Sequence, residues 1–159
     1  MQLHTILTPA RTLYGAAGTS RKRTLETAAS FIAAQTPAVD ADELYRSLIE
    51  RERLGSTGIG EGVAIPHSRM HNCDAITGTL ISLQQAVDFD SIDNKPVDLL
   101  FVLLVPIEAS DEHLQVLAEL ARLFSQEEFR SILRDANNDA ELYAAAINYA
   151  SANPSSIKQ

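Results

Sequence analysis

The chain has 159 residues and a mass of 17.3 kDa, a length at which one domain buries roughly 70 % of the surface that the unfolded chain exposes. Apolar residues make up 45 % of it and charged residues 21 %, which is too apolar for a disordered chain. The net charge of −8 and the isoelectric point near 4.9 argue against a nucleic-acid-binding protein, because such proteins need a basic surface for the phosphates.

The single cysteine, Cys73, excludes an internal disulfide and favours a reducing compartment. The longest apolar stretch, Leu99 to Pro106, is too short to cross a bilayer, and no basic-then-apolar leader opens the chain. We therefore expect a cytosolic protein without membrane insertion.

The first half of the chain predicts two helices. Residues 1–18, with their glycines and a proline, predict either a loosely ordered entry or a short edge strand. Apolar residues at helical spacing predict a helix over Arg21–Ala34, with Ser20 as its cap, and a second helix over Asp42–Leu54 that Gly55 ends.

The middle of the chain predicts loops and strands. Four glycines between Gly55 and Gly62 predict a loop, and it leads into a short extended run at Val63–Pro66. Further strands are predicted at Gly78–Gln84 and Val97–Val105. The last of these is a continuous apolar run, which is typical of a central strand buried on both faces.

The last third predicts three helices: one over residues 111–124, a short one opened by a capping box at Ser125–Glu128, and one over Asn138–Tyr149. This order of elements predicts an α/β fold with a mixed β-sheet flanked by helices. We expect a single domain over residues 1–159, with its core at about 20–150 and loosely ordered ends.

Chemistry-bearing residues are densest in the segment 51–67, RERLGSTGIGEGVAIPH. Glycines let backbone N–H groups approach an oxyanion, and the guanidinium of Arg51 suits a phosphoryl group in charge and geometry. His67 can act as a nucleophile through a neutral ring nitrogen. The candidate phosphate-binding residues in the loop are Ser56, Thr57, Gly58 and Gly60.

Other interpretations of this segment are weaker. A glycine-rich loop alone is most often a tight connection, and a single histidine is most often a packing or surface residue. The glycine spacing fits neither a dinucleotide fingerprint nor a phosphate-binding loop of the Gly-Lys-Ser/Thr type. The ligand types at His67, His71 and Cys73 lack the helical spacing of a zinc site, and no serine lies in a hydrolase elbow. We therefore expect no metal and no cofactor.

The run GSTGIGEGVAIPH resembles the active-site signature of the mannitol/fructose-type (type-2) IIA domains of the bacterial phosphoenolpyruvate-dependent phosphotransferase system. The nitrogen-regulatory branch of that family is the most similar. Two further segments resemble the family: Phe89–Pro106 its central strand region, and His113–Phe124 the helix with its second histidine. The resemblance runs from about Leu25 to Tyr149.

The resemblance implies that His67 accepts the phosphoryl group, with Arg51 and His113 as its partners in the site. A tele-phosphohistidine is implied, although the residues themselves leave the choice of ring nitrogen open. His113 lies in helical register with Leu117, Leu120 and Phe124, which points it inward. Ser68 departs from the family, in which the residue after the active histidine is Gly, Ala or Cys.

The resemblance further implies a cytosolic regulator that is phosphorylated by a histidine-phosphorylated HPr-like carrier, itself fed by enzyme I of the nitrogen system and phosphoenolpyruvate. Sensor kinases or potassium transport proteins would be its regulatory targets. We see no fused permease or carrier domain, which favours regulation over sugar import. Two alternatives stay open: a sugar-specific IIA component that passes phosphate to a IIB domain, and an interaction module that has lost phosphotransfer.

Overall fold

A computed structural model describes residues 2–109 and 111–154, which form a mixed α/β domain. The six strands are β1 (Thr12–Ala16), β2 (Gly58–Gly60), β3 (Val63–Ala64), β4 (His67–Met70), β5 (Thr77–Val87) and β6 (Val97–Pro106). The helices are α1 (Arg21–Gln35), α2 (Ala41–Leu54), α3 (Glu112–Phe124), α4 (Glu127–Arg134) and α5 (Asp139–Ala152), with short 3-10 turns η1 (Leu3–Thr5) and η2 (Pro9–Arg11).

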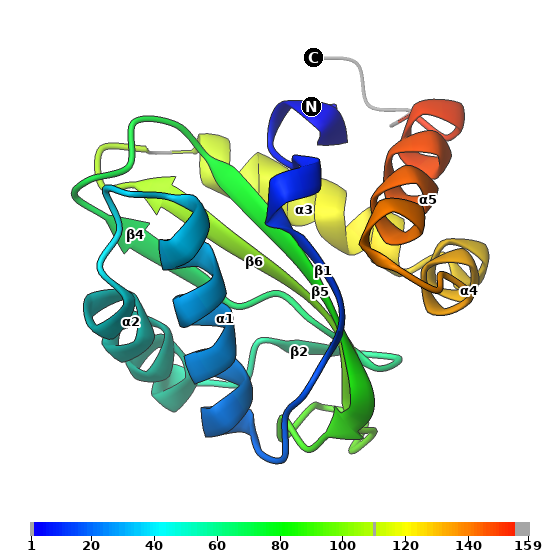
Figure 1. The fold of residues 1–159 in the computed structure, drawn as a ribbon, viewed down its shortest axis with the longest axis horizontal. Helices are drawn as coiled ribbons and strands as arrows, with labels where there is room; N and C mark the ends of the chain where they lie inside the picture. Colours follow the sequence, from blue (N-terminus) through cyan, green and yellow to red (C-terminus); the bar gives the residue numbers. More distant parts are fainter. Residues whose placement is uncertain (1, 110, 155–159) are drawn as a thin grey trace.

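The sheet has the strand order β1-β5-β6-β3-β2, and β4 also pairs with β6. Strand β5 runs antiparallel to β6 and parallel to β1, whereas β3 and β4 run parallel to β6. Helices α1 and α2 cover one face of the sheet, and α3, α4 and α5 lie beyond the other (Figure 1). The mixed sheet flanked by helices confirms the predicted fold class.

Strand β6 lies between these two layers. Its side chains alternate between the two hydrophobic clusters: Leu99 and Phe101 pack on the side of α3–α5, and Leu100 and Val102 on the side of α1 and α2. All four are at most 1 % exposed. The continuous apolar sequence of this strand is explained by burial on both faces, as predicted.

Helix α1 begins after the predicted cap Ser20, whereas α2 begins at Ala41, one residue before the predicted Asp42, after a cap at Asp40 that the sequence analysis did not name. The Ser20 hydroxyl accepts a hydrogen bond from the N–H of Arg23, and the carboxylate of Asp40 accepts one from the N–H of Glu43. Helix α2 ends at Leu54, immediately before Gly55. In the described part of the chain, no helix is both long and apolar enough to span a bilayer.

The predictions for the two ends of the chain have different outcomes. The edge strand foreseen within residues 1–18 exists as β1, but loose ordering of this segment is wrong, because Leu3, Ile6 and Leu7 are buried in the core. Their apolar side chains gain more from burial than the short segment loses by becoming ordered. At the other end, residues 155–159 lie outside the described residues.

Two short strands were missed. The expected loop at Gly55–Gly62 contains β2, and the extended run at Val63–Pro66 continues after Pro66 as β4. Strands this short carry no periodic signal and form because neighbouring strands offer them a partner: β2 pairs with β3, Gly58 with Ala64, and β4 pairs with β6, His67 with Leu103.

Three details of the last helices were wrong. The capping box at Ser125–Glu128 is absent: the Ser125 hydroxyl donates to the carbonyl of Arg122, and Gln126 is the residue before α4. Leu117 is only half-buried on α3, whose buried residues are Val116, Leu120, Leu123 and Phe124. The last helix begins after Asn138, which caps it, and runs on to Ala152.

Candidate functional site

The site lies where two short strands follow one another along the edge of β6. Strand β3 ends at Ala64, Ile65 and Pro66 interrupt the pairing, and β4 begins with His67. The carbonyl of Pro66 still accepts from the N–H of Leu103, so the chain stays against β6 through the interruption. His67 is therefore the first residue of a strand, whereas the sequence predicts an extended run that ends just before it, at Pro66.

Two hydrogen bonds orient the ring of His67. Its Nδ1 lies 3.0 Å from the carbonyl oxygen of Ile65, and its Nε2 lies 3.0 Å from Nε of Arg51. A carbonyl only accepts and a guanidinium only donates, so the proton is on Nδ1 and the lone pair of Nε2 points toward Arg51. The geometry leaves Nε2 as the nucleophilic nitrogen of the neutral ring.

The surroundings of His67 favour this neutral form. Burial of the ring lowers the pKa of His67 below its ordinary value of 6.5, and the positive charge of Arg51 lowers it further. The hydrogen bond to Ile65 and the charge of Glu52 act in the opposite direction, but they do not cancel the effect of burial on this pKa.

An open pocket of about 510 Å³ brings the three predicted catalytic residues together. Arg51 comes from the last turn of α2, His67 from β4 and His113 from the first turn of α3. Among the described residues, Arg51 forms no ion pair with a carboxylate, although its Nη1 donates to the carbonyl of Gly55 at 2.9 Å.

Sequence reasoning missed Arg69, which lines the same pocket. Its Nη2 lies 3.2 Å from Nε2 of His113, and its Nη1 donates to the carbonyl oxygens of Ile107 and Ala109. The available signal was strand alternation: residues two apart on β4 point to the same side, so Arg69 follows His67 into the pocket.

Ser68 is buried next to His67 in β4, and its hydroxyl contacts that of Ser47 on α2; both serines line the pocket of His67. Ser47 precedes Arg51 by one helical turn, so this contact ties the arginine-bearing face of α2 to β4. The departure from the family pattern at Ser68 is therefore accommodated as a small polar contact in the wall of the pocket.

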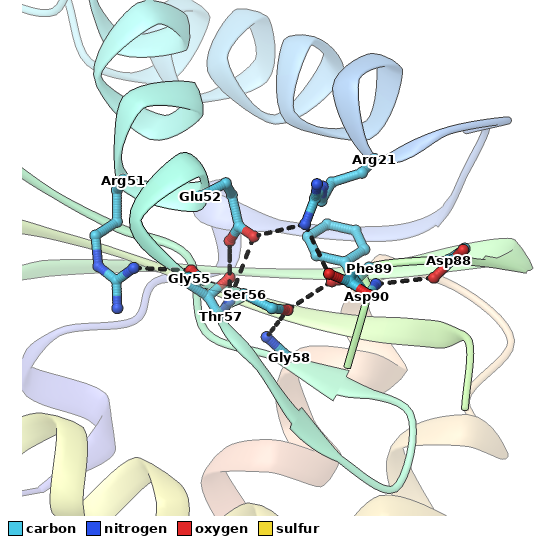
Figure 2. Close-up of polar contacts among 10 residues, drawn as sticks. All are labelled: Arg21, Arg51, Glu52, Gly55, Ser56, Thr57, Gly58, Asp88, Phe89 and Asp90. Atoms are coloured by element: carbon cyan, nitrogen blue, oxygen red, sulfur yellow. Dashed lines mark hydrogen bonds and ion pairs between the residues drawn. The ribbon is translucent and has the colours of Figure 1, made fainter. Parts of the chain in front are cut away.

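The glycine loop is organised by Glu52, a carboxylate that is only 5 % exposed. It accepts hydrogen bonds from the N–H and the hydroxyl of Thr57 and pairs with Arg21 at 3.4 Å (Figure 2). The hydroxyl of Ser56 donates to the carbonyl of Phe89 and accepts from the N–H of Gly58 (Figure 2). The loop is thereby joined to α1, α2 and the segment before β6.

These hydrogen bonds within the protein are enough to explain the residues of the loop, and phosphate binding is not needed to explain them. A side chain at Gly58 would collide with Ser91, and one at Gly60 would meet Asp93, so both glycines permit close packing of the two loops. None of Ser56, Thr57, Gly58 and Gly60 lines the pocket of His67. Phosphate binding by these four residues stays a prediction.

No group of three or more His, Cys, Asp or Glu side chains suited to a metal ion occurs among the residues that the structure describes. What the pocket offers is a neutral imidazole with an aimed lone pair, a guanidinium without a carboxylate partner and a second histidine, a set that suits transfer of an anionic group.

Comparison with known proteins identifies the family of the chain. The family model for EIIA 2 of the phosphoenolpyruvate-dependent sugar phosphotransferase system matches residues 5–149. A nitrogen regulatory protein of Pseudomonas aeruginosa is 43 % identical over 148 residues, which are 93 % of this chain and 96 % of that protein.

Two solved structures have the same fold. Nitrogen regulatory protein IIA-Ntr from Neisseria meningitidis superposes with a TM-score of 0.81 and 38 % identity, covering 89 % of this chain and 97 % of the other. IIA mannitol from Escherichia coli, at 17 % identity, covers 88 % of this chain and 98 % of its own with a TM-score of 0.72. The chain belongs to the EIIA type-2 family of the phosphotransferase system and is a homologue of its nitrogen regulatory proteins.

Proposed function

We propose that this protein accepts a phosphoryl group on Nε2 of His67 from a histidine-phosphorylated HPr-like carrier in the cytoplasm, and that its phosphorylation state controls partner proteins. The observation that carries the proposal is the pair of hydrogen bonds on His67. Because Nδ1 is held as a donor to Ile65, the lone pair of Nε2 is the one available at the pocket.

In the transfer step, the lone pair of Nε2 forms a bond to phosphorus while the bond between phosphorus and the carrier's ring nitrogen breaks. The electron pair of the broken bond returns to the carrier's ring. The Nδ1 proton of His67 stays on the ring and remains donated to Ile65. Arg51 turns its N–H groups from Nε2 to the phosphoryl oxygens, whose charge it offsets, and His113 flanks the same pocket.

Mass spectrometry of the intact protein tests the acceptor role. The chain is incubated with phosphoenolpyruvate, enzyme I and the nitrogen-type phosphocarrier, beside His67→Ala and the matched variant His71→Ala. We expect one acid-labile phosphoryl group on the wild type and on His71→Ala, and none on His67→Ala. No gain of mass with a competent carrier would overturn the proposal.

The regulatory role is supported by the homology to nitrogen regulatory proteins, and it needs a test of its own. Phosphorylation adds charge at the pocket and changes which surface a partner meets. We expect the cytoplasmic part of a sensor kinase or of a potassium transport protein to bind one of the two phosphorylation states more tightly. Passage of the phosphoryl group to a IIB domain with formation of sugar phosphate would instead indicate a transport component.

A further inference from the structure

Arg69 joins three parts of the molecule that are distant in sequence. Its Nη1 donates to the carbonyl oxygens of Ile107 at 3.0 Å and Ala109 at 2.8 Å, in the turn after β6. Its Nη2 lies 3.2 Å from Nε2 and 3.5 Å from Nδ1 of His113 on α3. One guanidinium thus contacts both the chain that leads toward α3 and the histidine in its first turn.

The position of Arg69 links these contacts to His67. The two side chains are two residues apart on β4, so they project from the same side of the strand. Arg69 is paired in register with Val105, which brings its side chain level with the end of β6 and the turn beyond it. Both side chains line the pocket that also contains His113.

The chemistry of these contacts is that of a positioning group. Three acceptors around one side chain, two carbonyl oxygens and one ring nitrogen, suit the rigid, planar fork of arginine and do not suit the single point charge of lysine. Among the described residues, Arg69 forms no ion pair with a carboxylate. Its exposed side chain is therefore held by two carbonyls and an imidazole, and its charge is not neutralised by an acidic partner.

We infer that Arg69 is a positioning residue, which holds His113 and the turn at 107–109 against the strand of His67 and so keeps the second histidine at the phosphoryl-transfer pocket. This inference rests on the proposed function for its effect on the transfer rate. Its effect on the conformation of His113 does not depend on that function.

Four variants test the inference: Arg69→Gln, Arg69→Lys, His113→Gln and the double variant Arg69→Gln/His113→Gln. Arg53→Gln is the matched control, since Arg53 is an exposed arginine of α2 that does not line the pocket of His67. Thermal unfolding of each variant identifies any that fail to fold. If Arg69→Gln does not fold, Arg69→Lys carries the test, because it keeps the charge and loses the fork.

The first readout is the ring signals of His113 in ¹H–¹⁵N spectra at one pH. We expect Arg69→Gln to shift the ring nitrogens of His113, Arg69→Lys to shift them less, and Arg53→Gln to leave them unchanged. If Arg69→Gln leaves them where the control does, the inference is wrong. This readout stands even if His67 accepts no phosphoryl group, so the two proposals fail separately.

The second readout is the rate of phosphorylation by a saturating concentration of phosphorylated carrier. We expect Arg69→Gln to slow it about tenfold, the size of effect seen when a partner that orients a site residue is lost. In the His113→Gln background, Arg69→Gln should slow it no further, since the two residues act as one unit. Fully multiplicative effects of the two substitutions would show that Arg69 does not act through His113.

Discussion

His67 is held in one tautomer by two neighbours that have opposite hydrogen-bonding characters. Ile65 supplies an acceptor to Nδ1, and Arg51 supplies a donor to Nε2. Protonation of Nε2 would remove the acceptor that Arg51 uses and would place two positive charges side by side. The same contacts that aim the lone pair therefore also oppose its protonation.

The first prediction concerns the titration of His67. Because burial and Arg51 lower its pKa, we expect a midpoint below 6.5 in ¹⁵N-detected NMR, with the ring neutral at pH 7. The unfolded chain takes up this proton first as the pH falls. His67 thus contributes stability that is present above pH 6.5 and is lost as the pH falls from 6.5 toward the folded pKa. A midpoint at or above 6.5 would contradict the burial and contacts described.

The second prediction concerns Arg51. Arg51→Gln removes the charge and the fork that face the phosphoryl group, and we expect its phosphorylation rate to fall about a hundredfold, as when one preorganised donor is removed. The phosphorylation rate of Arg51→Lys should lie between those of the wild type and Arg51→Gln, since lysine keeps only the charge. Arg53→Gln, two residues further along α2, serves as the control in the same rate measurement. Equal rates for Arg51→Gln and Arg53→Gln would exclude a direct role for Arg51.

At the scale of elements, helix α2 and the glycine loop are joined by a buried acidic side chain. Glu52 lies next to Arg51 but points inward, where it satisfies the backbone and the hydroxyl of Thr57 and pairs with Arg21 (Figure 2). A carboxylate buried in this way is stable only with such partners. It thus fixes the direction in which the chain leaves α2, and with it the path toward His67.

The third prediction is that Glu52→Ala destabilises the fold. The N–H and hydroxyl of Thr57, which is 5 % exposed, lose their acceptor. Leaving such groups without a partner costs about 1–3 kcal/mol. Urea unfolding measures this loss, with Glu50→Ala as the control because Glu50 is exposed on the same helix. A midpoint for Glu52→Ala equal to that of Glu50→Ala would show that the loop does not depend on Glu52.

For the whole molecule, β6 is the element through which both sides of the sheet and the site are connected. It pairs with β5, β3 and β4, and its side chains enter both hydrophobic clusters. Phe101 contacts Phe124 of α3 edge-on, with ring centroids 6.2 Å apart. Strand β6, which pairs with the strand of His67, is thus packed against α3, the helix whose first turn contains His113.

The fourth prediction is that Phe101→Ala lowers the free energy of unfolding by about 3–5 kcal/mol, since it empties a fully buried aromatic site. Phe101→Leu should cost less because it leaves a smaller cavity. Exposed Ile92, which is 88 % exposed, provides the control Ile92→Ala with an expected change within about 0.5 kcal/mol. Chemical unfolding followed by circular dichroism measures all three; a loss at Phe101→Ala no larger than at Ile92→Ala would refute this view of the core.

Much of the architecture can be predicted from local pattern. Helices α1 and α2 begin at capping side chains, α2 ends before a glycine, and β6 has an apolar run that only a doubly buried strand explains. The motif around His67 was sufficient to identify the family, which the comparisons confirm. These features depend on residues near one another in sequence, so their physical causes are visible there.

The arrangement of the site was decided by tertiary structure. Strands β2 and β4 are too short to have a periodic signal and exist because of pairing with neighbouring strands. The contacts of Arg51 with His67 and of Arg69 with His113 join residues 16 and 44 positions apart. Local patterns in the sequence were enough to predict the helices, the central strand and the family. The tautomer of His67, the inward turn of Glu52 and the contacts of Arg69 depend on distances that only the packed sheet and helices set.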